Sequence, residues 1–123
     1  MKLPSLLLAC VLFAGCAARP IHPGAANAVD SNAYDTIFIA HNVIESTKAD
    51  LSANKFPASI APNVVTALNR LVTAYNLADQ DYIAYHNAAL GGTATPAQAA
   101  ALQSSVTDVS SAVSAVASAK GGM

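Results

Sequence analysis

The stretch PNVVTALNRLVTAYNLADQDYIAYHNAAL, residues 62–90, decides the fold, because its apolar residues recur at intervals of three and four. Pro62 suits the first position of a helix, where a missing N–H costs no hydrogen bond. Gly91 and Gly92 follow the last apolar residue and favour a helix end. The spacing therefore predicts a helix over 62–90, with one buried face formed by Val64, Leu68, Leu71, Tyr75, Ala78, Tyr82, Tyr85 and Ala89.

The preceding segment is predicted to form a helix over 32–54. Asp30, Ser31 and Asn32 are all residue types that cap a helix N-terminus. The apolar spacing predicts a buried face formed by Tyr34, Ile37, Phe38, His41, Ile44 and Leu51.

A third helix is predicted over 96–119. Thr95 can cap its N-terminus, Pro96 suits the first helical position, and Gln98 can complete a capping box. Its expected seam consists of Leu102, Val106, Val109, Val113 and Val116. Because short loops make successive helices antiparallel, the expected fold is all-α, an antiparallel up-down-up three-helix bundle over 31–120.

A lysine and a short apolar segment precede this domain. The apolar run over 3–15 follows Lys2 and is shorter than the roughly 20 residues that a membrane-spanning helix needs. It ends in Phe13-Ala14-Gly15-Cys16, which resembles the lipobox of bacterial lipoprotein signal peptides, with phenylalanine where leucine is usual. The resemblance implies that residues 1–15 are removed and that Cys16 becomes an N-terminus carrying diacylglycerol and an amide-linked fatty acid such as palmitate.

Two other processing sites remain open. Leu7-Leu8-Ala9-Cys10 is a rival lipobox, but it leaves an apolar region at the lower limit of about seven residues. A plain secretory signal could instead be cut near 14–15 or 17–18. Under either lipobox the chain's two cysteines, Cys10 and Cys16, cannot form a disulfide with each other.

The segment 16–30 is predicted to be a lipidated N-terminus and a flexible tether, because it contains Pro20, Pro23 and Gly24 and lacks apolar periodicity. His22 is expected to be a solvated residue of this tether. Ala17 is not the aspartate that retains lipoproteins at the inner membrane, so the resemblance points to the periplasmic face of the outer membrane in a diderm host.

The composition excludes several function classes. Charged residues make up only 11% of the chain and the net charge is −1, so nucleic acid is not an expected partner. The sequence contains no nucleophile elbow, zinc-protease motif, P-loop or dinucleotide-binding glycine motif. We therefore expect neither catalysis nor a cofactor.

The best candidate binding residues are His41, Glu45 and Tyr75. His41 and Glu45 are four residues apart on one helix, and antiparallel packing brings His41 to the level of Tyr75. His86 would lie roughly 17 Å further along the bundle, too far to share an ion with His41. No metal is expected, because two ligands are fewer than zinc needs.

These features together favour a small lipid-anchored protein of the cell envelope with a non-catalytic structural or accessory role. Its expected partners are membrane lipid, through acylated Cys16, and either another envelope protein or a second copy of the chain. The alternative is a periplasmic module that binds a small molecule or a metal through the helical domain.

Overall fold

The computed structural model describes residues 21–121, and it contains three helices and no strand within that range. They are α2 (Ala28–Ser52), α3 (Ala61–Leu90) and α4 (Pro96–Gly121). The expected all-α class with three helices is confirmed for these residues. The predicted signal peptide, Cys10, Cys16 and the start of the tether lie outside them. No helix within 21–121 combines the length and the apolar character required to cross a membrane.

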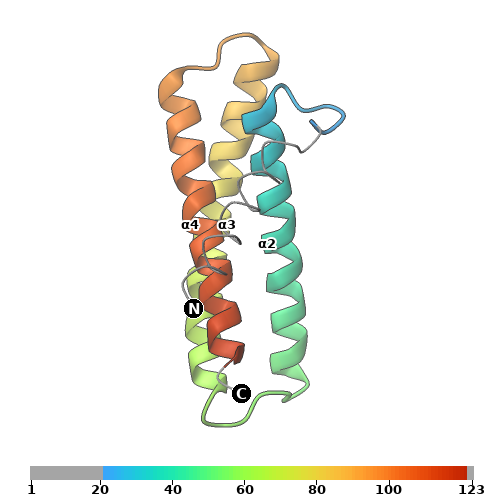
Figure 1. Cartoon of the computed structure of the whole chain (residues 1–123), viewed down its shortest axis with the longest axis vertical. Coiled ribbons are helices and arrows are strands. Elements are labelled where there is room, and N and C mark those ends of the chain that lie inside the picture. The colour runs from blue at the N-terminus through green and yellow to red at the C-terminus, as the bar shows by residue number, and fades with distance from the viewer. Residues whose placement is uncertain (1–20, 122–123) are drawn as a thin grey trace, which may run out of the picture.

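The three helices lie side by side and form an elongated bundle (Figure 1). The chain descends along α2, returns along α3 and descends again along α4, with one connection at each end of the bundle (Figure 1). Asn54 in the first connection has φ 54° and Gly92 in the second has φ 73°. Both residues adopt the left-handed conformation that ends a helix and turns the chain.

The helix starts follow from their caps. Asn27 caps α2, because its Oδ1 accepts a hydrogen bond of 3.0 Å from the backbone N–H of Asp30. The helix thus begins four residues before the predicted position 32, and Asp30 lies inside its first turn. At α4 the predicted capping box is present: Thr95 N–H donates to Oε1 of Gln98 over 3.0 Å, and Gln98 N–H donates to Oγ1 of Thr95 over 3.1 Å.

The buried seam of α2 differs from the predicted one. Its buried residues repeat at intervals of three and four and include several small side chains: Asp30, Ala33, Ile37, Ala40, Ile44 and Thr47. Tyr34, Phe38 and His41 lie one position further round the helix and are exposed, Tyr34 to 43% and Phe38 to 55%. The prediction that these three residues belong to the core was therefore wrong, because the stripe that includes the small residues already faces α3 and α4.

The seam of α4 is shifted in the same way. Its buried residues are Leu102, Ser105, Val109, Ala112 and Val116, whereas the predicted Val106 and Val113 are only partly buried. Burial of Ser105 is permitted because its hydroxyl donates a hydrogen bond to Oδ2 of Asp81 on α3. Asp81 is thus a structural hydrogen-bond acceptor between α3 and α4.

Candidate functional site

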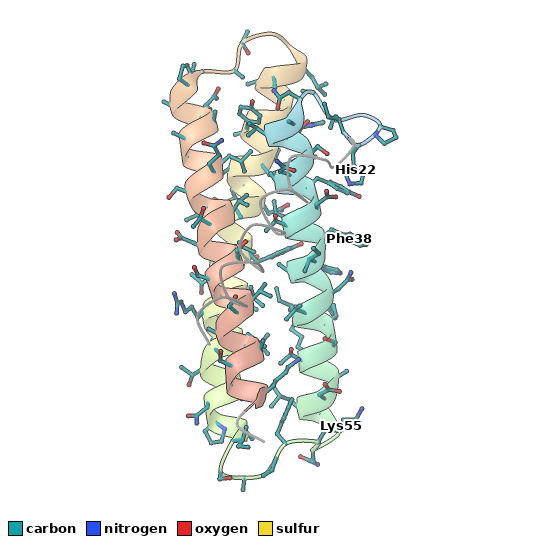
Figure 2. All side chains as sticks on the ribbon, in the orientation of Figure 1. His22, Phe38 and Lys55 are labelled. Atoms are coloured by element: carbon teal, nitrogen blue, oxygen red, sulfur yellow. The ribbon has the colours of Figure 1, made fainter. Side chains whose placement is uncertain are left out.

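A groove lined mainly by aromatic side chains lies between α2 and α3. The residues that line it occur at intervals of three and four on each helix, which places them on facing stripes. They surround a cavity of about 300 Å³ and are Tyr34, Ile37, Phe38, His41, Tyr75, Asp79 and Tyr82, a set we call the aromatic groove. Figure 2 shows Phe38 projecting from the side of α2 that is turned away from α4.

The rings of the groove contact one another in pairs. Tyr34 lies 6.3 Å from Tyr82 across the groove and 6.3 Å from Phe38 along α2, centroid to centroid, with the Tyr34 and Phe38 rings only 10° from parallel. His41 lies 6.1 Å from Tyr75. The later residue of α2, His41, therefore pairs with the earlier residue of α3, Tyr75, and the earlier residue Tyr34 pairs with the later residue Tyr82. These spacings are within the range over which aromatic rings attract each other.

The tyrosines on the α3 side of the groove resist ionisation. Burial raises the pKa of the Tyr75 hydroxyl above its ordinary value of 10.0, and the negative charges of Asp79 and Glu45 add to the effect. Burial also raises the pKa of Tyr82, and the nearby carboxylate of Asp30 raises it further. Both hydroxyls are therefore neutral at physiological pH, and the negative charge of the groove comes from the carboxylate of Asp79.

Asp79 is the carboxylate that lines the groove itself. It is half-buried, and it makes no hydrogen bond or ion pair with residues 21–121. Glu45 lies further down α2, where it is exposed and 3.8 Å from Lys48. A half-buried carboxylate without a partner favours an incoming donor or cation.

A fully buried carboxylate lies behind the upper end of the groove. Oδ2 of Asp30 accepts a hydrogen bond of 2.6 Å from the backbone N–H of Ala26, and it is 2.7 Å from Nδ1 of His86 on α3. Oδ1 of Asp30 is buried without a hydrogen-bond partner among the described residues. The Asp30–His86 pair therefore ties the first turn of α2 to α3.

A second His–Asp pair holds the turn that precedes α2. Nε2 of His22 is hydrogen-bonded to Oδ1 of Asp35, and the His22 ring lies edge-on to Tyr34 at 4.8 Å. His22 is thus packed against α2 (Figure 2) rather than solvated in a tether, as the sequence had suggested. The turn covers a cavity of about 220 Å³, whose other walls include Tyr82 and His86.

The structure brings together part of the predicted binding set. His41 and Tyr75 face each other in the groove, and Glu45 lies close enough to influence the Tyr75 hydroxyl. His41 and His86 line separate cavities. The sequence interpretation missed Asp30 as the partner of His86. The sequence carries a signal only for the burial of Asp30, which precedes Ala33 by three residues and so extends the spacing of the buried seam.

The groove is not the largest cavity of the described region. A cavity of about 480 Å³ lies between α3 and α4 and is lined by Arg70, Thr73, Ala74, Leu77, Ser105 and Asp108. It contains no aromatic ring, and its carboxylate and guanidinium groups compensate each other in charge. The smaller aromatic groove offers more specific chemistry, because rings converge there with a carboxylate that has no partner among residues 21–121.

The groove is suited to binding through ring faces and one negative charge. Within residues 21–121, no group of three or more His, Cys, Asp or Glu side chains is arranged to hold a metal ion.

Comparison of the chain with family models, with curated proteins and with solved structures finds no match.

Proposed function

We propose that this protein is a lipid-anchored accessory protein of the cell envelope that acts by binding a partner through the aromatic groove, without catalysis. In this proposal the lipobox resemblance at Cys16 supplies the anchor, the residues after Cys16 supply a tether, and the antiparallel three-helix bundle is a rigid support. The outer membrane is the expected site in a diderm host.

The exposed aromatic row of α2 carries the proposal. Phe38 is 55% exposed and the neighbouring Ile39 is 47% exposed, while Tyr34 is 43% exposed. Aromatic residues are enriched at protein interfaces, where they supply a large contact area at low entropic cost. A helix that faced only solvent would gain nothing from exposing these side chains, so a partner that covers them is the simplest reason for their position.

A site-specific photocrosslinking experiment tests the binding face. A photoreactive phenylalanine analogue replaces Phe38 in the full chain expressed in its host, and the same analogue at the exposed Ser111 on α4 is the matched control. We expect a discrete adduct from position 38 only, and its loss when Tyr34→Ala and Tyr82→Ala are added. Equal crosslinking from both positions, or none from position 38, would contradict the proposal. An adduct of twice the chain's mass would identify the partner as a second copy.

The anchor is tested separately. Cys16→Ser should release the protein from the membrane fraction or leave it unprocessed, and globomycin should block maturation of the unmodified chain. Cys10→Ser is the matched control and should leave anchoring unchanged. If Cys10→Ser alone abolishes anchoring, the rival lipobox is the one used. If neither substitution matters, the chain is not a lipoprotein.

A small-molecule binding function is the second candidate. The cavity of about 300 Å³ is at the lower end of the size range of small-molecule pockets, and it combines apolar walls with few polar groups. The crosslinking experiment separates the candidates, because a small molecule gives no protein adduct.

A further inference from the structure

We propose that the aromatic groove receives a lysine or arginine side chain of a partner polypeptide, with Asp79 as its counter-charge and the surrounding rings as its walls. The inference rests on the proposed function and specifies the chemistry of the partner.

Asp79 lies between two tyrosines of the groove on the same face of α3. Asp79 lies four residues after Tyr75 and three before Tyr82, so all three side chains lie on one stripe of α3. Its charge acts on both tyrosine hydroxyls. Asp79 is therefore a half-buried negative charge between two rings, and it is not neutralised by any hydrogen bond or ion pair within residues 21–121.

The lysine and arginine side chains of the described region lie outside the groove. Lys48 is paired with Glu45 at 3.8 Å, and Lys55 is paired with Asp50 at 3.3 Å beyond the end of α2. Arg70 lines the cavity between α3 and α4. No lysine or arginine of the described region lines the aromatic groove. The groove is consequently complementary to a cation that comes from another molecule.

The aromatic rings of the groove can attract a cation through their faces. A cation placed over the face of a tyrosine or phenylalanine within about 6 Å is attracted by the ring quadrupole. Tyr34, Phe38 and Tyr82 are within 6.3 Å of one another in successive pairs, so one cation in the groove can approach several of them. A neutral or anionic group would lack this cation–quadrupole attraction and would leave Asp79 without a counter-charge among the described residues.

The rim of the groove favours a polypeptide over a free amine. The cavity of about 300 Å³ accommodates one long side chain, and the exposed Phe38 and Ile39 extend the apolar surface beyond it. A free cation would occupy the cavity and leave this rim uncovered. A basic residue within a polypeptide brings apolar side chains of neighbouring residues onto the rim, beside its own methylene groups.

The test uses the full chain and two short peptides that differ in one group. Each peptide has a leucine and then a glycine on either side of a central residue, which is arginine in one and its neutral analogue citrulline in the other, so that the leucines can cover the apolar rim. We expect the arginine peptide to shift the resonances of the groove tyrosines and the citrulline peptide to bind much more weakly. Asp79→Asn should weaken binding of the arginine peptide about tenfold, as for loss of a charge-assisted hydrogen bond.

Asp108→Asn is the matched control, because it removes the same charge from an exposed position on α4 and should leave the affinity unchanged. Equal binding of the citrulline peptide, or an unchanged affinity after Asp79→Asn, would overturn the inference. Free arginine that binds as tightly as the peptide would overturn the assignment to a polypeptide. A crosslink from position 38 that persists after Asp79→Asn would contradict this inference while leaving the proposed function intact.

Discussion

The carboxylate of Asp30 and the imidazole of His86 are bonded at 2.7 Å, although 56 residues separate them in the chain. Asp30 is fully buried, and its Oδ2 also accepts the backbone N–H of Ala26. The pair therefore fixes the start of α2 against the last turns of α3, directly behind Tyr82. The His86 ring also stacks on the ring of Tyr82 at 5.4 Å, so the pair is in direct contact with one wall of the aromatic groove.

Removing the imidazole should destabilise the bundle. We expect His86→Ala to lower the free energy of unfolding by about 2 kcal/mol, because it leaves a buried carboxylate short of a partner. Asp30→Asn should also destabilise, and the double variant should lose less than the sum of the two single losses, since the residues interact directly. Urea unfolding at neutral pH measures all three. His41→Ala, at an exposed position, is the control and should change stability by no more than about 0.5 kcal/mol.

Asn27 performs two functions that a substitution can separate. Its Oδ1 caps α2, and its Nδ2 donates a hydrogen bond of 2.9 Å to the hydroxyl of the buried Tyr85. Asn27→Ala should cost about 2 kcal/mol, since it removes a cap and a long-range hydrogen bond together. Asn27→Ser can still cap the helix, so it should retain about half of that stability. Thermal unfolding distinguishes the two, and identical losses would show that the Tyr85 contact contributes nothing.

The sequence predicted the helices better than their faces. The capping box Thr95–Gln98 is a local signal, and it located the start of α4 correctly. Rotation about a helix axis depends instead on which stripe the other helices cover. Large residues at 34 and 38 suggested one stripe, whereas the stripe that contains Ala33 and Ala40 is buried. Apolar spacing cannot distinguish a core aromatic from an exposed one a single position away.

The candidate site was predictable only in part for the same reason. The sequence predicted that antiparallel packing would place His41 and Tyr75 at one level, and the two rings are 6.1 Å apart in the structure. The position of Asp79 in the groove could not be anticipated, because the groove exists only when Tyr34 and Phe38 lie outside the core. Asp30 and His86 form a long-range pair between helices, and a single sequence carries no direct signal for such contacts.

The rotated seam of α4 gives a direct test by substitution. Val109 is fully buried, whereas Val106 is only partly buried. Val109→Ala should destabilise by about 2 kcal/mol, from lost apolar burial and the cavity left behind. Val106→Ala removes the same atoms from a partly exposed site and should cost clearly less. If the two variants unfold at the same denaturant concentration, the seam is the one predicted from the sequence, which includes Val106 and Val113.

The raised pKa values of Tyr75 and Tyr82 predict how stability depends on alkaline pH. A tyrosine whose pKa is higher in the folded state retains its proton more tightly there than in the unfolded chain. Its contribution to stability is therefore intact below the ordinary value of 10.0 and is lost as the pH rises through the higher folded-state pKa. Besides burial, Asp79 and Glu45 raise the pKa of Tyr75, and Asp30, Tyr34 and Asp79 raise that of Tyr82. The rings of His41 and His86 pack against those of Tyr75 and Tyr82.

We expect the free energy of unfolding to decrease over that alkaline range and the decrease to be smaller in Tyr75→Phe and Tyr82→Phe, which cannot ionise at these positions. Asp79→Asn should lower both folded-state pKa values, because it removes a negative charge that opposes phenolate formation. Phenolate absorbance during an alkaline titration of the folded protein measures these values, and Asp108→Asn is the control for the loss of one carboxylate elsewhere. Titration curves of the Asp79 and Asp108 variants that coincide would show that Asp79 does not act on the groove tyrosines, and the electrostatic description of the aromatic groove would then be wrong.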